Sequence, residues 1–253
     1  MNLAKHLKEL FGKAKPVNAT GDSDAVQATT NPHNTMGKTG QDHNKTWDQM
    51  ARTSALYAIY ATEDQQKFER GGIEDAQLIA QWVTSDSIVL DVGCGIGRIE
   101  KYLAPYCREL HSVDVSREML AQARARLAGI PNVHLHHTTA TDLSCLGTET
   151  VDLAFSLLVL QHIEKEDAYL ALREIHRVLR PGGIAYLQFP NLFADIYFRV
   201  FVEAAEMETR PVHRMRLYTP AEAVFLLEKV GFRIEQRLGD AVEILLLASK
   251  ATS

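Results

Sequence analysis

Apolar positions follow two different periodicities along most of the chain. From residue 87 onward, short continuous apolar runs alternate with segments whose apolar residues recur every three or four positions. The runs predict buried strands, and the segments between them predict amphipathic helices. The predicted strands cover residues 87–91, 109–114, 133–137, 151–156 and 184–189, and the predicted helices cover 98–104, 117–127 and 165–179. This alternation is typical of right-handed βαβ units, so we expect an α/β fold with a doubly wound parallel sheet.

The first part of the chain has a different pattern. A basic amphipathic helix is predicted at the start, because apolar residues at helical spacing are interspersed with lysines. The apolar positions are Leu3, Leu7, Leu10 and Phe11. Such a helix docks on its own domain or on a sister subunit more often than on a membrane surface, and the sequence leaves both open. Residues 16–45 are polar, with few large apolar side chains, which predicts a flexible arm.

Two further helices, at 47–61 and 74–83, are predicted before the first strand. We therefore divide the chain into an N-terminal helix and arm at 1–46 and one α/β domain at 47–253. Within that domain, residues 191–218 form an aromatic helical segment that we expect to act as an inserted cap.

The last part of the chain predicts an antiparallel end to the sheet. A helix is expected at 220–230, because Thr219-Pro220 is a good start signal and Gly231 a good stop signal. Strands are then expected at 232–238 and 242–249, separated by the turn dipeptide Gly239-Asp240, which favours a hairpin.

Composition narrows the class of protein. The chain has 253 residues, of which 46% are hydrophobic, which suits one globular unit. Its net charge of −5 argues against nucleic acid as a partner. The three cysteines are too scattered for a disulfide framework, and no run of about 18 apolar residues occurs. We therefore expect a cytoplasmic protein with no membrane span.

The segment VLDVGCGIGR at residues 89–98 contains the main candidate site. Gly93, Gly95 and Gly97 follow the first predicted strand, where glycine permits positive φ and lets a ligand approach the backbone. Asp114 ends the second predicted strand about twenty residues later, where an acid can accept hydrogen bonds from both ribose hydroxyls of an adenosine ligand. The spacing therefore favours nucleoside binding over a tight turn without a ligand.

The details of this segment separate two adenosine cofactors. A dinucleotide site has the pattern G-x-G-x-x-G, whereas this chain has G-x-G-x-G followed by Arg98. Asp91 precedes the glycines, and its negative charge suits the cationic methionine end of S-adenosylmethionine better than a pyrophosphate. The sequence thus favours S-adenosyl-L-methionine over NAD.

Four motifs in order resemble those of the class I S-adenosylmethionine-dependent methyltransferases, from about Trp47 to Lys250. They are VLDVGCGIGR, VDVS, VDLAFSLLVLQHI and LREIHRVLRPGGIAYLQFP. The resemblance implies a Rossmann-like sheet of seven strands with an antiparallel last strand, and small-molecule methylation. It assigns cofactor contacts to residues of the first two motifs, which are Asp91, Gly93, Cys94, Gly95, Gly97, Asp114 and Val115.

The same resemblance assigns the remaining cofactor contacts. The backbone N–H of Ala140 would bind the adenine ring, and Thr139 or Asp142 would accept the exocyclic amine. At this position family members usually have Asp-Ala-x-Asp-Leu, whereas this chain has Thr139 in place of the first acid. From its position, and not from the resemblance, we expect Leu157 to line the methionine moiety, because it is closer than His162 to the end of the fourth strand.

His162 is the candidate catalytic residue, because it follows the fourth strand on the side where cofactor and acceptor should meet. A neutral imidazole can accept a hydroxyl proton at pH 7. His162 could instead contact the cofactor or substrate, or pack locally.

Three other histidines, at positions 134, 136 and 137, lie on a predicted strand, where the first two share a face. They lack a third ligand for a metal ion.

We expect the acceptor pocket to be built from the helices before the sheet and from the segment at 191–218. The candidate side chains are Arg52, Tyr57, Tyr60, Phe193, Tyr197, Phe198, His213, Arg214 and Arg216. Such a mixture of aromatic and cationic groups suits a small sugar-bearing or anionic acceptor.

The favoured function is methyl transfer from S-adenosylmethionine to a small molecule. Oxygen is favoured as the acceptor atom over nitrogen and carbon. The alternatives are methylation of a macromolecule, an NAD-dependent oxidoreductase, and a non-catalytic binding or assembly protein with the cofactor fold. The sequence also leaves open whether the protein is a homodimer.

Overall fold

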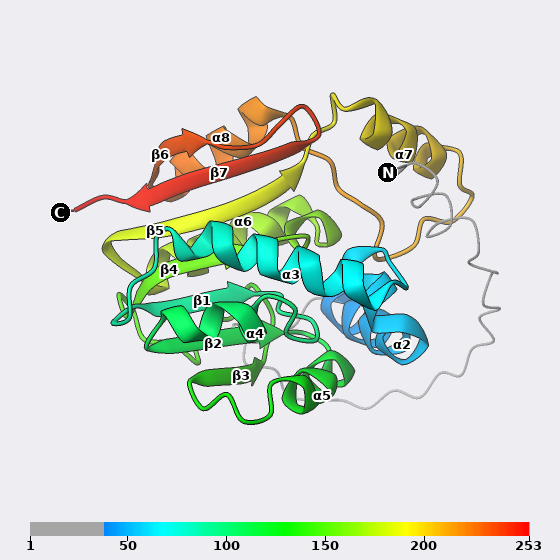
Figure 1. The fold of residues 1–253 in the computed structure, drawn as a ribbon. Coiled ribbons are helices and arrows are strands. Elements are labelled where there is room, and N and C mark those ends of the chain that lie inside the picture. The colour runs from blue at the N-terminus through cyan, green and yellow to red at the C-terminus, as the bar shows by residue number, and fades with distance from the viewer. Residues whose placement is uncertain (1–37, 253) are drawn as a thin grey trace, which may run out of the picture.

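The computed structural model describes residues 38–252. The predicted N-terminal helix and most of the predicted arm lie outside this range, as does the last residue. The described chain forms a seven-stranded sheet with strand order β3-β2-β1-β4-β5-β7-β6 (Figure 1). This order, with crossovers to both sides of β1, is the doubly wound arrangement that the sequence predicts.

The strands occupy the positions expected from the apolar runs, with one extension. They are β1 (Ile88–Val92), β2 (Glu109–Asp114), β3 (Val133–His137), β4 (Val151–Ser156), β5 (Leu179–Pro190), β6 (Phe232–Arg237) and β7 (Glu243–Lys250). β5 begins earlier than the prediction of 184–189, because Leu179 already pairs with Val151 and an irregularity in the ladder accommodates the Arg-Pro-Gly-Gly turn. β7 is antiparallel to β5 and to β6, so the predicted hairpin and antiparallel last strand are confirmed.

Helices cover both faces of the sheet (Figure 1). On one face lie α3 (Gln65–Ala80) and α4 (Glu100–Leu103), followed by the short helix η1 (Ala104–Tyr106); on the other lie α6 (Lys165–Val178) and α8 (Pro220–Val230). Each face has its own apolar core: Ile79 of α3 packs with Val89 and Leu110, while Ile175 of α6 packs with Leu90. Alternate residues of β1 therefore enter opposite cores, which explains why its sequence is apolar throughout.

The helix α2 (Lys38–Tyr60) crosses the carboxyl ends of the central strands. It begins before Trp47, where the sequence analysis placed the start of the folded domain, and it bends at Ser54, whose φ and ψ are −163° and 101°. Three polar contacts attach it to α5 (Arg117–Arg126). The Asp48 carboxylate accepts from the Ser116 hydroxyl at 2.6 Å, the Gln122 amide donates to the Ala51 carbonyl at 3.0 Å, and Arg52 pairs with Glu118 at 2.6 Å. These contacts place one face of α2 over the ends of β1 and β2.

The segment at 191–218 contains one helix, α7 (Asp195–Ala205), beyond the end of β5. Figure 1 shows α7 at the far corner of the molecule from β3. Its buried side chains, including Tyr197 and Val200, pack in a small separate cluster with Leu217. The Tyr197 hydroxyl donates to the Glu243 carboxylate, which joins α7 to β7.

Candidate functional site

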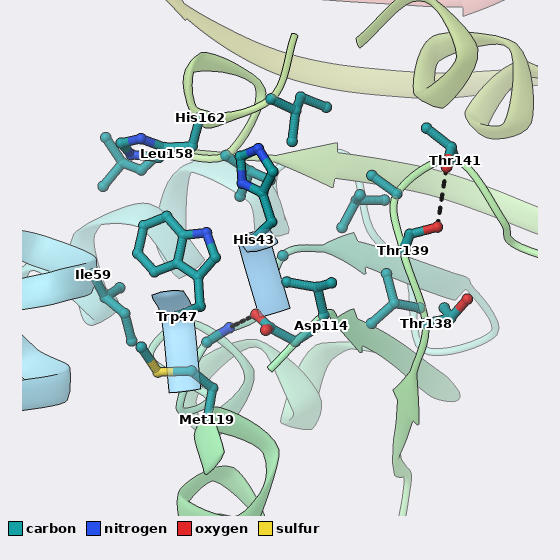
Figure 2. Close-up of a pocket in the computed structure, with 18 of the residues that line it drawn as sticks. His43, Trp47, Ile59, Asp114, Met119, Thr138, Thr139, Thr141, Leu158 and His162 are labelled. Carbon is teal, nitrogen blue, oxygen red and sulfur yellow. Dashed lines mark hydrogen bonds between the residues drawn. The ribbon is translucent and has the colours of Figure 1, made fainter. Parts of the chain in front are cut away.

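A pocket opens at the carboxyl ends of β1, β2 and β4, beneath α2 (Figure 2). Ligands of doubly wound folds bind at this edge, where the strand order reverses. Its walls come from α2, the turn after β1, the end of β2, the loop after β3 and the segment between β4 and α6. Eight of the eleven residues named as site residues from the sequence line it: Gly93, Gly95, Asp114, Val115, Thr139, Ala140, Leu157 and His162.

The glycine turn exposes backbone to this pocket. Gly93 and Gly95 have φ values of 95° and 55°, a region that side chains with a Cβ rarely adopt. The N–H groups of Gly93 and Cys94 donate to the Val113 carbonyl at 2.8 and 3.1 Å, which ties the turn to β2. A Cβ on Gly93 would lie 2.2 Å from Val159, so the turn leaves no room for a larger residue.

Asp114 joins the turn to the neighbouring strand. One carboxylate oxygen accepts from the Gly95 N–H at 2.8 Å (Figure 2), and the other accepts from the Ser116 N–H, also at 2.8 Å. Burial raises the pKa of Asp114 to about 6, although these hydrogen bonds favour its charged form. Each carboxylate oxygen can accept a second hydrogen bond, so the fixed, pocket-facing carboxylate fits a ligand with two adjacent hydroxyls.

Three residues predicted to contact the cofactor lie behind the turn and do not line the pocket. Asp91 is only 4% exposed, and burial together with the neighbouring Glu100 raises its pKa well above the usual range. Cys94 is also buried, and its thiol lies against the Gly95 carbonyl. A Cβ on Gly97 would lie 2.7 Å from Leu127, so this glycine is needed for packing. Of the cofactor contacts predicted in this motif, Gly93 and Gly95 line the pocket and the other three do not.

The loop after β3 forms a second wall of the pocket. Thr138, Thr139, Ala140 and Thr141 line it, and the hydroxyls of Thr139 and Thr141 lie 3.0 Å apart. The alternative assignment of the adenine amine to Asp142 is not supported, because its carboxylate accepts from the Ser144 N–H at 3.1 Å and does not line the pocket. Asp167, in the first turn of α6, does line the pocket, and the sequence analysis did not identify it.

The segment after β4 holds a strained residue. Leu158 has a φ of 62°, and its N–H donates to the Gln188 side chain of β5 at 2.9 Å. Leu157 and Leu158 line the pocket, as does Ile59 of α2. These three side chains give the pocket apolar surface.

His162 ends the short helix η2 (Leu160–His162) and lies at the same end of the pocket. Its Nδ1 lies 2.8 Å from the His213 carbonyl oxygen, which can only accept, so Nδ1 carries the proton and Nε2 is the acceptor. The nearest polar contact of Nε2 is a long one, 3.4 Å to the Gln161 amide. Burial lowers the pKa of His162 to about 4, with the Arg216 guanidinium adding to the effect. The imidazole is therefore neutral at pH 7, and the His213 carbonyl fixes its tautomer and the orientation of its ring.

Two residues of α2 that the sequence analysis did not select complete the pocket. His43 and Trp47 lie one helical turn apart and both line it (Figure 2). The Trp47 and His162 rings meet edge to face, with centroids 5.0 Å apart. The only sequence signal was their spacing of four residues, which core packing explains equally well.

The side chains expected to form an acceptor pocket lie elsewhere. Arg52 and Phe193 have exposed side chains, and Tyr60 packs on Phe68. Arg214 and Arg216 both pair with Glu164, at 3.2 and 2.5 Å. Residues of the segment at 191–218 reach the pocket only from behind His162: the His213 carbonyl accepts from its Nδ1, and the Arg216 guanidinium donates to its backbone carbonyl at 3.0 Å. No residue of this segment lines the pocket, because α7 packs beyond β5 instead of over it.

The histidines of β3 follow the predicted alternation. The rings of His134 and His136 stack against His111 of β2, at 5.0 and 5.3 Å, whereas Nε2 of His137 contacts the Val115 carbonyl on the other side. Within residues 38–252, no group of three or more histidine, cysteine, aspartate or glutamate side chains is arranged to hold a metal ion.

Comparison with known proteins identifies this architecture. A family model described as a methyltransferase domain matches residues 90–187, which include the glycine turn, Asp114 and the segment after β4. Residues 90–187 therefore correspond to a methyltransferase domain, and the match supports the class I S-adenosylmethionine-dependent methyltransferases as the family. The predictions of this family of enzymes, its fold and S-adenosylmethionine as its cofactor are confirmed, and the NAD alternative is set aside.

The relatives of this chain carry the names of different methyltransferases. The chain is 30% identical over 151 residues to a probable S-adenosylmethionine-dependent methyltransferase of Mycolicibacterium smegmatis, covering 60% of this chain and 54% of that protein. It is 30% identical over 179 residues to a trans-aconitate 2-methyltransferase of Rhodopseudomonas palustris, covering 69% and 66%. The chain thus spans about half to two thirds of the length of these relatives.

A solved structure supports the fold independently. The magnesium protoporphyrin IX methyltransferase of Synechocystis, with bound S-adenosylhomocysteine, superposes with a TM-score of 0.64 at 18% identity, covering 85% of this chain and all (100%) of that one. Among the described residues, no helix is long and apolar enough to span a bilayer. The acceptor, the cytoplasmic location, a homodimer and the absence of nucleic-acid binding stay predictions.

Proposed function

We propose that the protein transfers a methyl group from S-adenosylmethionine to a hydroxyl oxygen of a small, neutral molecule. The observation that carries this proposal is the position of His162, which shares one pocket with Asp114 and the glycine turn and keeps Nε2 as a hydrogen-bond acceptor. When bound, the cofactor supplies an electrophilic methyl carbon and a sulfur leaving group.

The protein contributes orientation and a proton acceptor. Asp114 and the turn hold the adenosine half, while Nε2 of His162 accepts the hydrogen bond of the acceptor hydroxyl and aims its oxygen. Proximity and orientation of this kind supply on the order of 7 to 11 kcal/mol of the barrier. The hydroxyl becomes strongly acidic as its new C–O bond forms, so even an imidazole with a pKa of about 4 can take the proton at that stage.

The walls around His162 support a neutral acceptor. Trp47, Leu158 and Val159 are apolar, and among the described residues no lysine or arginine lines the pocket. Arg214 and Arg216 are already paired with Glu164, so they offer no free clamp for an anion. An acceptor carboxylate would lose its hydration without a compensating cation, which disfavours the anionic acceptors considered from the sequence alone.

An assay of S-adenosylhomocysteine release tests this proposal, with matched pairs of acceptors such as a phenol and its carboxylated counterpart. We expect turnover of neutral hydroxyl compounds at least tenfold above that of their carboxylated partners. A preference for the carboxylates would contradict the acceptor class, and failure of the protein to bind S-adenosylhomocysteine by calorimetry would contradict the function itself.

The variant His162→Ala tests the role of the imidazole. We expect kcat to fall about a hundredfold, as is typical when a positioned proton acceptor is removed. Affinity for S-adenosylhomocysteine should stay within about threefold of the wild type. His176→Ala is the matched control, because His176 packs against Phe232 on the far side of α6; equal turnover in all three proteins would exclude His162 as the acceptor of the proton.

A further inference from the structure

The wall formed by the loop after β3 presents hydroxyls to the pocket and no carboxylate. Thr138, Thr139 and Thr141 line it, whereas the carboxylate of Asp142 accepts from the Ser144 N–H and does not line the pocket. The exocyclic amine of an adenine at this wall therefore has hydroxyls but no carboxylate from β3 or its loop.

A carboxylate reaches the pocket from a different element. Asp167 lines it together with Thr139, Thr141 and Ile163. Within residues 38–252 its carboxylate makes no hydrogen bond or ion pair, whereas the other pocket-facing carboxylate, Asp114, holds two backbone N–H groups. Asp167 is thus an acceptor without a partner in the described chain.

The packing of α6 places Asp167 on the face of the helix that lies along the loop after β3. Glu174, on α6, accepts from the Leu143 N–H at 3.1 Å, so this face of the helix lies along the loop after β3. Asp167 is seven positions before Glu174, which is about two helical turns on the same face. The step from Glu174 back to Asp167 spans about 10 Å along α6. The step of four residues from Leu143 back to Thr139 spans at most about 13 Å. The two lengths are similar, so Asp167 can lie beside Thr139 while Glu174 contacts Leu143.

We propose that Asp167 recognises the adenine base by accepting a hydrogen bond from its exocyclic amine. This role rests on the proposed function, because it needs the adenosine half of the cofactor at Asp114 and Ala140. The first turn of α6 favours a negative charge at this position, since the backbone N–H groups there lack partners within the helix. Asp167 would then supply, from α6, the acid missing at Thr139.

Calorimetry with two ligands separates this role from general binding. The first is S-adenosylhomocysteine, and the second is S-inosylhomocysteine, in which a carbonyl oxygen replaces the amine. We expect the wild type to bind the adenosyl ligand at least tenfold more tightly, because a carboxylate facing a carbonyl leaves both acceptors unpaired.

The variant Asp167→Asn should remove that preference. Its amide can donate to the carbonyl of the inosyl ligand, so we expect adenosyl binding to weaken about tenfold and inosyl binding to hold or strengthen. Glu166→Gln is the matched control, since Glu166 is an exposed acid in the same helical turn, and it should keep the wild-type ratio. Melting temperatures of all three proteins check that each is folded.

Two results would overturn the proposal. If Asp167→Asn keeps the wild-type ratio, the preference comes from the Ala140 backbone and Asp167 does not read the base. If the wild type binds neither ligand, the cofactor site and the proposed function fail together, which calorimetry on the wild type alone shows.

Discussion

The two halves of the pocket are built in different ways. The cofactor half consists of Gly93, Gly95 and Asp114, at the ends of two paired strands whose register joins Val92 to Val113. The half around His162 is formed by side chains of α2 and η2, which are far apart in the sequence and meet where Trp47 contacts His162. The first half is set by backbone conformation, and the second by packing between separate elements.

The two halves also differ in how firmly they are attached. β1 is hydrogen-bonded on both sides within the sheet, whereas α2 is held by an apolar cluster and by polar contacts near the surface. Buried strand ladders open only with global unfolding, while elements held by exposed contacts open locally. The wall that faces the acceptor is therefore the easier one to loosen without loss of the sheet.

The largest effect is expected for Asp114→Ala, which removes the acceptor from the cofactor half. Two hydrogen bonds to a charged group are lost, each worth about 1.5 to 3 kcal/mol, so affinity for S-adenosylhomocysteine should fall by about a hundredfold or more. Titration calorimetry measures this. Asp142→Ala, which removes an acid outside the pocket, should bind as the wild type does; equal affinity of both variants would refute the ribose assignment.

The pH dependence of cofactor binding should also distinguish the half of the pocket at Asp114 from the half at His162. The pKa of Asp114 is about 6 in the free protein, and hydroxyl donors favour its ionised form, so affinity should be nearly full above about pH 7, about half of that at pH 6, and lower still as pH decreases further. The expected loss is at most tenfold between pH 6 and pH 5. His162, with a pKa of about 4, stays neutral over this range and contributes nothing to the change.

Calorimetry from pH 5 to pH 8 measures this dependence. Asp114→Asn cannot titrate, so its weaker binding should be flat over the same range. A wild-type profile without a fall below pH 6 would mean that Asp114 does not carry the binding energy.

The smallest effect is expected for Asp48→Ala, which weakens the attachment of α2 to α5. The carboxylate accepts from the Ser116 hydroxyl at 2.6 Å and from the Glu118 N–H at 3.2 Å, so its loss should cost about 1 kcal/mol and lower the Tm by about 2 to 4 °C. Hydrogen exchange should quicken in α2 and stay unchanged in β1. Gln49→Ala, at an exposed neighbouring position, is the control, and faster exchange in β1 as well would show that the two halves open together.

Elements whose signals lie within a short stretch of chain were predicted most accurately. The strand at 133–137 and the helix at 220–230 have the predicted limits, because apolar periodicity and the Thr219-Pro220 and Gly231 signals lie within a few residues of each end. The position of Asp114 at the pocket followed from its distance to the glycine turn. By contrast, Asp91 was assigned to the ligand from its charge, and only the structure shows that it is buried beside Glu100.

Residues were missed where the site depends on contacts between distant elements. His43 lies in a stretch that reads as a polar arm, and it lines the pocket only because α2 extends back to Lys38 and docks on α5. The aromatic residues of α7 looked suited to a cap, yet Phe198 is 52% exposed because the helix packs beyond β5.

By itself, the sequence determined the doubly wound sheet, the glycine turn and the acid that follows it, because strand periodicity and positive φ are properties of short stretches of chain. Only the tertiary structure decided which side chains wall the pocket: Trp47 against His162, and Asp167 in the same pocket as Thr139. Such neighbours depend on how whole helices dock, and a docked helix is fixed by many contacts that no short stretch contains.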